Sequence, residues 1–408
     1  METLTYVMTS TFFPPYHIGG DAVHVELLSR ELVRLGHEVH VVHSIDAYRL
    51  KHRTLPKEGY SADHVVVHPI KSPLGRISPF ISYVAGSPFP IGEKMTQLVK
   101  NINPDVVHHH NLSLLGPFIL GVQSAVKLYT AHDYWLICPQ SSLLRRGISL
   151  CYRPHNCSVC SLLSRRPPQL WRYSSALKKK LKNIDVIIAP SHFAKSVLEK
   201  NQVNGNLVVM PNFSPEVSCT EAPHTHESPY FLYVGVLERH KGVMDLITTF
   251  IEIRQLVRAN LLIVGRGSLE NEIRKTIKKS GCEKNIFLLG HLDGSELADL
   301  YNQASAVVIP SMWHENCPLV ALEAMASGTP LIVSNNGGLP ELVREPELGF
   351  VYSNREELKS ILAEFSKDEF NPNIIKKVHA ARYSPSRYVQ NLLKHIAQAG
   401  VSVKATQI

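Results

Sequence analysis

The feature that most constrains this chain is a regular alternation of short apolar runs with amphipathic helical patterns, which occurs in both of its halves. In the first half, one helical pattern ends at Leu35 after apolar residues that recur every three or four positions, and Gly36 follows where a helix C-terminus favours glycine. Strands that alternate with helices are typical of a parallel sheet covered on both faces. For this half, the sequence predicts strands over 4–8, 38–43, 105–108, 127–130 and 185–189.

The second half repeats the scheme after a polar stretch, 214–229, that contains three prolines and has no periodicity. This stretch is predicted to link two domains, and 408 residues are enough for two hydrophobic cores. Two doubly wound, Rossmann-like α/β domains would face a central cleft, because such sheets bind ligands at the carboxyl ends of their strands. The predicted strands cover 230–234, 261–264, 286–289, 306–309 and 330–333, and the predicted helices cover 242–257, 269–280, 295–303 and 319–327.

Composition excludes several classes of protein. Hydrophobic residues make up 44% of the chain and charged residues 19%, which is globular rather than disordered usage. No apolar run approaches the roughly 20 residues that cross a bilayer, and the N-terminus lacks the basic and apolar regions of a signal peptide. Seven cysteines in a chain of this kind do not suggest a disulfide scaffold. We therefore expect a soluble, cytoplasmic protein.

Positive charge is concentrated in the first half of the chain. Residues 1–210 hold 23 Lys and Arg against 13 Asp and Glu, a net of +10, whereas residues 211–408 hold 20 against 22, a net of −2. Positions 145–200 alone carry 12 basic residues against two acids. A solvated helix face explains part of such a run, and an anionic partner such as a membrane surface, a phosphate or a nucleic acid is the alternative.

The densest group of functional residue types is the segment SMWHENCPLVALE, which ends at Glu323. Glu315 lies in a loop after a predicted strand, and Pro318 is predicted to occupy the first position of the next helix. The backbone amides around Leu319 and Val320 would then form an anion site. Two carboxylates for hydroxyl groups and a helix N-terminus for a pyrophosphate fit a sugar nucleotide. The simpler alternative is two chance surface charges.

This segment, extended over 314–343, resembles glycosyltransferase family 4, whose members are retaining enzymes with the GT-B fold. The family's motif of two glutamates separated by seven residues is matched by Glu315 and Glu323. The resemblance covers nearly the whole chain, since further family segments occur in the expected order at 12–42, 190–197, 209–213 and 233–242.

The resemblance implies roles for several residues. Glu323 would bind the ribose hydroxyls of the donor and Glu315 a hydroxyl of its sugar. Gly19 and Gly20 would lie close to the diphosphate and the acceptor, where only backbone without a side chain fits. Lys241 matches the lysine that contacts the donor phosphates and would stabilise the departing diphosphate.

The chain departs from the commonest family pattern at one position. Gly235-Val236 stands where the family often has Gly-Arg, so Arg239 is the expected substitute for the missing phosphate-binding arginine. His132 matches a histidine that reaches the transferred sugar, whereas the run 108–110 of three histidines is interpreted as structural. No pair of acids is placed to hold a catalytic metal, so catalysis is expected to need no cofactor. By family analogy, the acceptor attacks from the face that the nucleotide leaves.

Four of the cysteines form a separate cluster, with the spacing C-x12-C-x5-C-x2-C, inside a long segment without a clear helix or strand pattern, 138–168. Such spacing resembles a tetrathiolate zinc site or, less closely, an iron–sulfur site, and buried free thiols are the alternative. A long unsupported loop in a compact domain favours a structural metal ion. The predicted ligands are Cys138, Cys151, Cys157 and Cys160.

The combined prediction is a retaining GT-B glycosyltransferase. Its N-terminal domain (1–213) would bind the acceptor and its C-terminal domain (230–385) a nucleoside diphosphate sugar, with 386–408 packing back on the N-terminal domain. Basic charge suggests attachment to the inner membrane face and a role in lipid-linked or surface polysaccharide synthesis, with no nucleic acid as partner. The alternatives are a zinc-stabilised nucleic-acid-binding protein and a non-hydrolysing sugar-nucleotide epimerase.

Overall fold

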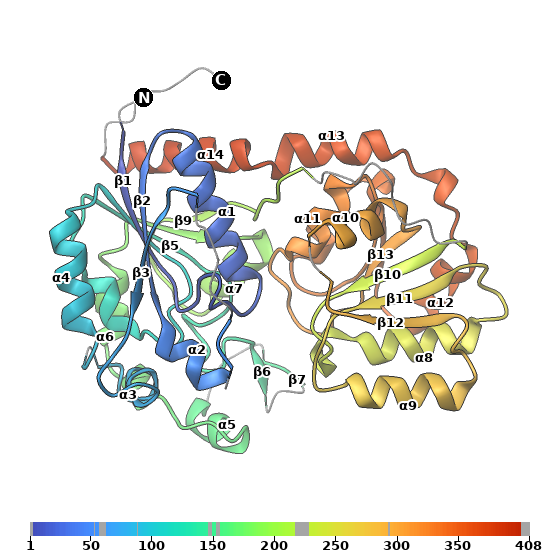
Figure 1. Cartoon of the computed structure of the whole chain (residues 1–408), viewed down its shortest axis with the longest axis horizontal. Coiled ribbons are helices and arrows are strands. Elements are labelled where there is room, and N and C mark those ends of the chain that lie inside the picture. Colours follow the sequence, from blue (N-terminus) through green and yellow to red (C-terminus); the bar gives the residue numbers. More distant parts are fainter. Residues whose placement is uncertain are drawn as a thin grey trace. The chain divides into compact units, whose positions relative to one another are not determined.

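The structure, a computed structural model, describes residues 3–52, 54–56, 63–87, 89–145, 149–151, 156–216, 228–292 and 294–400. The chain divides into two compact units (Figure 1): unit 1 comprises Met1–Pro211 and Pro385–Ile408, and unit 2 comprises Asn212–Ser384. Most of the predicted linker (217–227), Cys219, and the basic residues Arg146 and Arg153 lie outside the described residues.

Unit 1 is built on a seven-stranded sheet in which every recorded strand pair is parallel. The strand order β3-β2-β1-β4-β5-β8-β9 grows outward in both directions from β1 and β4, which makes the sheet doubly wound. The strands are β1 (Thr5–Thr9), β2 (Glu38–Ser44), β3 (Val66–Ile70), β4 (Val106–His109), β5 (Val126–Thr130), β8 (Val186–Ala189) and β9 (Leu207–Val209).

Helices accompany the strands of this sheet, and the chain's last described helix returns to it. Helix α14 packs against α1, with the ring of Tyr388 edge-on to His24 at 5.2 Å between centroids. The helices of unit 1 are α1 (Gly20–Arg34), α2 (Ile45–Lys51), α3 (Ile77–Ala85), α4 (Gly92–Ile102), α5 (Cys157–Leu163), α6 (Ala176–Leu181), α7 (His192–Lys200) and α14 (Pro385–Gln398), with short 3-10 turns η1 (Pro117–Gly121) and η2 (Leu170–Tyr173).

Unit 2 is a six-stranded parallel sheet with the order β12-β11-β10-β13-β14-β15, so its order reverses between β10 and β13. Alternate residues of β10 enter different cores: Leu232 packs in one apolar cluster and Phe231 in another, as expected for a sheet buried on both faces. The strands are β10 (Tyr230–Val234), β11 (Asn260–Val264), β12 (Ile286–Gly290), β13 (Ala306–Ile309), β14 (Leu331–Ser334) and β15 (Gly349–Tyr352).

Two sets of helices cover the two faces of this sheet (Figure 1). One set is α8 (Val243–Ile253), α9 (Glu270–Ser280) and α12 (Arg355–Glu364), and the other is α10 (Gly294–Gln303), α11 (Leu319–Ala326) and α13 (Pro372–Tyr383). Short 3-10 turns are η3 (Arg239–Lys241), η4 (Leu339–Leu342), η5 (Pro346–Leu348) and η6 (Lys367–Glu369). No helix in the described part of the chain combines the length and apolarity that crossing a membrane requires.

The structure confirms the α/β prediction and corrects three details. Each predicted strand is present within one residue of its expected ends. Pro318 is the N-cap of α11 with extended backbone, φ −70° and ψ 134°, so Leu319 and not Pro318 opens the helix. The helix predicted over 242–257 ends at Ile253. The segment expected to lack regular structure contains α5 and a small hairpin of β6 (Leu144–Arg145) and β7 (Ser149–Leu150).

Candidate active site

The predicted donor residues of unit 2 follow β10 and β13, the two neighbouring strands where the sheet order reverses. This is the place where doubly wound sheets leave room for a ligand. Gly242, directly after Lys241, holds the two loops together: its φ is +71°, and a Cβ there would lie 1.8 Å from the carbonyl oxygen of Pro310. Only glycine fits this contact.

An ion pair joins the two loops. Lys241 Nζ lies 2.7 Å from Glu315 Oε1, and the Ser311 hydroxyl donates to the same oxygen at 2.8 Å. The Glu315 side chain is 7% exposed, while Lys241 retains 25% of its exposure and lies 4.9 Å above the ring of Trp313. The lysine is therefore the accessible partner, able to reach a bound anion without leaving the site.

Glu315 remains ionised despite its burial. Desolvation raises the pKa of its carboxyl, but the positive charge of Lys241 and the hydrogen bonds to Lys241 and Ser311 outweigh that effect and bring the pKa below its ordinary value. A carboxylate in this state can accept a hydrogen bond from a ligand hydroxyl.

The loop after β14 supports the backbone of the loop that carries Glu315. The backbone N–H of Gly338 donates to the carbonyl oxygen of Glu315 at 2.6 Å, and the Asn336 amide donates to the carbonyl oxygen of Ser311 at 2.9 Å. Lys241 and Ser311 thus hold the Glu315 carboxylate, and the loop after β14 holds the backbone that carries it. The sequence pattern did not single out Ser311 or Asn336, although both follow strand ends, which is the signal that could have found them.

The start of α11 supplies backbone N–H groups and a second carboxylate. Leu319 and Val320 are the first residues of this helix and are half-buried, and the first N–H groups of a helix have no intrahelical acceptor. The carboxylate of Glu323 accepts a 2.8 Å hydrogen bond from the Tyr301 hydroxyl of α10. Burial raises the pKa of Glu323, and the tyrosine opposes that shift. Tyr301 is a third residue that the sequence analysis missed.

Arg239 does not join the Lys241–Glu315 pair through any contact that the described residues record. Its side chain is 77% exposed, and its guanidinium lies 3.5 Å from Glu272 of α9. An exposed pair of this kind contributes little free energy, so Arg239 can rotate away from it at small cost. The structure therefore brings together Lys241, Glu315 and Ser311 and leaves Arg239 at the edge.

In unit 1, the two predicted glycines begin α1. Gly19 is the N-cap with φ +85°, a backbone conformation that side chains rarely adopt, and Gly20 is the first helical residue. Both are exposed. They leave the backbone of the β1–α1 turn open to a ligand, in the position that doubly wound sheets use for phosphates.

His132 lies directly after β5 and contacts two other imidazoles. Its Nε2 lies 2.9 Å from Nδ1 of His110, and its ring centroid is 4.8 Å from that of His24. Burial lowers the pKa of His132 to about 3 and those of His24 and His110 well below their ordinary value, so all three are neutral near pH 7. The 2.9 Å contact is then a hydrogen bond in which one ring donates and the other accepts.

The three-histidine run is structural only in part. His108 and His109 bond to the hydroxyls of Thr130 and Thr9 inside the sheet, as predicted. His110, in contrast, belongs to the His132 cluster, because it follows the end of β4 beside β5. Ligand atoms of His24, His110 and His132 all lie within 4.8 Å of one another, close enough for one metal ion. The direct hydrogen bond between two of them favours a proton-sharing cluster.

Asp133, next to His132, is a further titratable group of this region. Burial raises the pKa of its carboxyl to about 7, and the backbone N–H of Trp135 donates to it at 2.7 Å. It therefore changes charge near neutral pH, unlike the histidines beside it.

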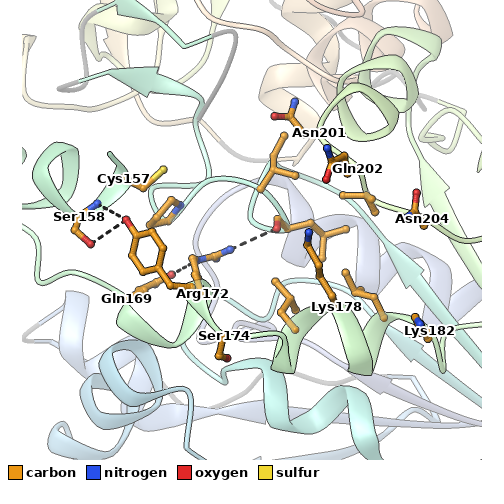
Figure 2. Close-up of a pocket in the computed structure, with 17 residues that line it drawn as sticks. Cys157, Ser158, Gln169, Arg172, Ser174, Lys178, Lys182, Asn201, Gln202 and Asn204 are labelled. Atoms are coloured by element: carbon orange, nitrogen blue, oxygen red, sulfur yellow. Dashed lines mark hydrogen bonds between the residues drawn. The ribbon is translucent and has the colours of Figure 1, made fainter. Parts of the chain in front are cut away.

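A separate cavity of ≈ 320 Å³ opens between η2, α6 and the end of α7 (Figure 2). Leu177 and Leu181 contribute to an apolar floor, and Lys178 and Lys182 carry the charge at its rim. Of the predicted site residues only Cys157 reaches it. All four predicted metal ligands, Cys138, Cys151, Cys157 and Cys160, line a second, much smaller cavity of unit 1.

Two glycosyltransferase families together match most of the chain. The family described as Glycosyltransferase Family 4 matches residues 18–214, and that described as Glycosyl transferases group 1 matches residues 220–387. An uncharacterised glycosyltransferase of Methanocaldococcus jannaschii is 25% identical over 394 residues, which cover 92% of this chain and 94% of that protein.

Two solved structures share the fold. Sucrose-phosphate synthase from Thermosynechococcus elongatus superposes with a TM-score of 0.70 and 19% identity, covering 97% of this chain and 98% of that one. The Anabaena protein HepE, solved in complex with UDP-glucose, superposes with a TM-score of 0.65 and 16% identity, covering 97% of this chain and all of that one (100%).

Proposed function

The chain belongs to the glycosyltransferases of the family 4 type with the GT-B fold, and from this premise we propose that it transfers a sugar from a nucleoside diphosphate sugar to an acceptor with retention of configuration. The observation that carries the proposal is the Lys241–Glu315 ion pair at the strand-order reversal of unit 2. Together, the ion pair, the N-terminus of α11 and the second carboxylate would provide contacts for the diphosphate, the sugar and the ribose of such a donor.

In this proposal, Lys241 holds the diphosphate and stabilises the charge that develops on it as the sugar departs. The backbone N–H groups of Leu319 and Val320 at the start of α11 assist, because a helix N-terminus favours an anion. Glu323, fixed by Tyr301, accepts hydrogen bonds from the ribose hydroxyls, and Glu315 accepts one from a sugar hydroxyl.

The same lysine has two partners in turn. Without a donor it neutralises Glu315, and with a donor bound it lies between the carboxylate and the diphosphate. Arg239, exposed and only weakly paired, is free to swing toward the phosphates as a second cation. No metal ion is required in this scheme, and the departing phosphate oxygen takes the proton of the attacking hydroxyl.

UDP is the first nucleotide to test. HepE shares the fold over most of both chains and was solved with UDP-glucose, which supports a uridine donor here as a starting hypothesis.

His132 would contact the transferred sugar on the unit 1 side. A neutral imidazole hydrogen-bonded to His110 can donate to or accept from a hydroxyl, but it does not carry the charge of a general acid at pH 7. We therefore assign it a binding and orienting role.

We further propose that unit 1 attaches to an anionic membrane and uses a lipid-linked acceptor. Helix α5 and turn η2 expose large apolar side chains, among them Leu162, Leu170 and Tyr173. Exposed basic residues flank them at Arg165, Arg166 and along α6. Apolar side chains beside basic ones are typical of surfaces that bind anionic lipid. One member of the basic run is not part of this surface, because the guanidinium of Arg172 packs against the rings of both Trp135 and Trp171.

The two alternative functions are not favoured. A nucleic-acid-binding protein would leave the donor residues of unit 2 without a role, and the family matches cover both units. An epimerase would not need an acceptor, and the pair Glu315 and Glu323, which matches the glycosyltransferase motif, argues against this alternative.

A product analysis tests the proposal. Full-length protein is incubated with UDP, GDP, ADP and dTDP sugars and a panel of lipid-linked and free sugar acceptors, and release of nucleoside diphosphate is measured. We expect release that depends on one donor and on an acceptor, and an anomeric NMR signal in the product that matches the configuration of the donor. An inverted product would reject the retaining assignment, and acceptor-independent isomerisation of the donor would favour the epimerase.

A further inference from the structure

The four cysteines predicted as metal ligands come from three separate segments of unit 1 and line one small cavity, although no three of their sulfur atoms in the described part of the chain lie within 4.8 Å of one another. Cys138 lies in the loop between β5 and β6, Cys151 follows β7, and Cys157 and Cys160 lie one turn apart in α5. All four line one cavity of ≈ 20 Å³. Backbone hydrogen bonds hold two of them in place, from Cys138 to the carbonyl oxygen of Tyr134 at 2.8 Å and from Cys151 to that of Leu143 at 2.7 Å.

Apolar burial does not explain why α5 is held at this position. The helix has seven residues, of which Ser161 is the buried one, and Val159, Leu162 and Leu163 are 56%, 60% and 54% exposed. The neighbouring strands β6 and β7 have two residues each. Helices and hairpins of this size are marginal in isolation. A few hydrogen bonds, such as those from Gln140 to Cys160 and Ser164, connect these segments, and a further link would stabilise them.

The surroundings of the sulfur atoms suit thiolates. The Gln140 side-chain amide donates to Cys160 Sγ at 3.2 Å, and the backbone N–H groups of Gln140 and Leu143 donate to the sulfur of Cys138. Arg145 lines the cavity, and the positive charge of Arg172 acts on Cys138. Donors and cations of this kind orient metal-bound sulfur and offset its charge.

We propose that Cys138, Cys151, Cys157 and Cys160 together bind one structural zinc ion. The protons of the four thiols pass to the buffer, and the four thiolates close a tetrahedral shell that leaves no position for a substrate. A cavity of ≈ 20 Å³ is about the size of one water molecule, which suits a single ion rather than an iron–sulfur cluster of several atoms.

The ion would have a definite structural role. It ties the loop that begins at His132 to α5, and α5 in turn contributes Cys157 and Ser158 to the wall of the larger cavity (Figure 2). Ser158 donates to the Tyr173 hydroxyl from both its backbone N–H, at 3.2 Å, and its side chain, at 3.1 Å, so the same link extends to η2.

Metal analysis of the full chain, purified without chelator, tests the proposal independently of any transferase activity. We expect zinc at about one ion per chain. Cys157→Ala and Cys160→Ala should each lower it to trace amounts, while Cys282→Ala, which changes a buried cysteine of unit 2, should retain it. Absence of zinc from the wild type, zinc retained by Cys157→Ala, or iron with visible absorbance would each overturn the proposal.

A measurement on the wild type guards against variants that fail to fold. Stepwise titration with a mercurial thiol reagent, in the presence of a chromogenic zinc indicator, should release the zinc as the cysteine sulfurs react. Protein reconstituted with Co²⁺ should show the intense visible bands of tetrahedral thiolate coordination. Thiol modification without zinc release, or cobalt bound without those bands, would contradict a tetrathiolate site.

Discussion

Lys241 Nζ lies 2.7 Å from Glu315 Oε1, and this contact joins the loops that follow β10 and β13. These strands are neighbours in the sheet although 71 residues separate the end of one from the start of the other in the printed sequence. The lysine keeps part of its exposure while the glutamate is buried. In the proposed function this cation contacts a ligand anion, and its carboxylate partner keeps it oriented when no ligand is bound.

Lys241→Ala should reduce kcat/KM for donor sugar far more than Arg239→Ala. Removal of one charge-stabilising group from a desolvated site costs about 10²-fold in rate. Arg239 is 77% exposed and pairs with Glu272, so we expect its loss to cost less than about tenfold. Steady-state kinetics of both variants decide the matter. If Arg239 proves the more costly residue, the phosphate contacts are shifted in this protein.

Glu323→Gln and Glu315→Gln should have different kinetic effects. In the proposed function Glu323 holds the ribose, so its loss should weaken donor binding by about tenfold or more, the scale of one hydrogen bond to a charged group. Glu315 is proposed to contact the reacting sugar, so its loss should lower mainly kcat. Glu296→Gln, an exposed position of α10, is the matched control. Donor affinity and turnover at wild-type levels in both variants would contradict the assignment.

Tyr301→Phe separates positioning from binding. The hydroxyl of Tyr301 donates to one carboxylate oxygen of Glu323, Oε2, so its loss frees the carboxylate without removing it. We expect weaker donor binding than in the wild type but stronger binding than in Glu323→Gln, measured by calorimetry. Equal losses in the two variants would mean that the tyrosine, and not the carboxylate, contacts the donor.

Unit 1 should lose stability as the pH falls below about 6.5. Burial lowers the pKa of His109 and His132 to about 3 and that of His43 to about 4, so these rings stay neutral in the folded state while they protonate in the unfolded state. The unfolded state then binds more protons, and the free energy of unfolding decreases. Asp133, with its pKa raised to about 7, and Asp21, whose pKa burial also raises, act in the opposite direction, as two groups against several.

Urea unfolding at pH 7.5 and 5.5, followed by the fluorescence of Trp135 and Trp171 in unit 1, measures this effect. A free energy of unfolding that stays constant or rises at pH 5.5 would show that the histidine cluster is not buried as described.

Binding of the protein to anionic vesicles should require the lysines at α6 and should weaken as the salt concentration rises. Each Lys or Arg near an anionic surface contributes about 1 kcal/mol, so reversing Lys178, Lys179 and Lys182 to Glu should lower co-sedimentation by about 10²-fold or more. Reversing Lys275, Lys278 and Lys279 of α9 is the matched control in unit 2. Equal binding to neutral and anionic vesicles would reject the electrostatic account.

The sequence predicted most of the strands of the two parallel sheets. Apolar runs such as 230–234 and 306–309 coincide with β10 and β13, because strands buried on both faces must be continuously apolar. Several shorter elements were missed. Strand β3 begins at the exposed Val66 and contains Pro69, and β9 has three residues, so neither carries a strong periodic signal.

Side-chain partners were less predictable than strand positions. The pairing of His110 with His132 depends on β4 lying beside β5, and the contact of Tyr301 with Glu323 depends on how α10 packs against α11. Because Arg239 lies two residues before Lys241, it was expected to replace the missing phosphate-binding arginine. In the structure, Arg239 belongs to the short turn η3 and pairs with Glu272 of α9. Such contacts follow from tertiary packing, which spacing along one chain does not encode.

The most direct test of the central claim is calorimetric titration of the full chain with UDP, GDP, ADP and dTDP. The account predicts that one of them binds at about one site per chain, and that it stabilises the protein by about 2.7 kcal/mol at 100 times its dissociation constant. It also predicts that Lys241→Ala weakens this binding while Lys275→Ala, on the exposed face of α9, leaves it unchanged. Absence of binding for all four nucleotides, or binding that Lys241→Ala does not alter, would contradict the claim that unit 2 holds a nucleotide sugar at the Lys241–Glu315 pair.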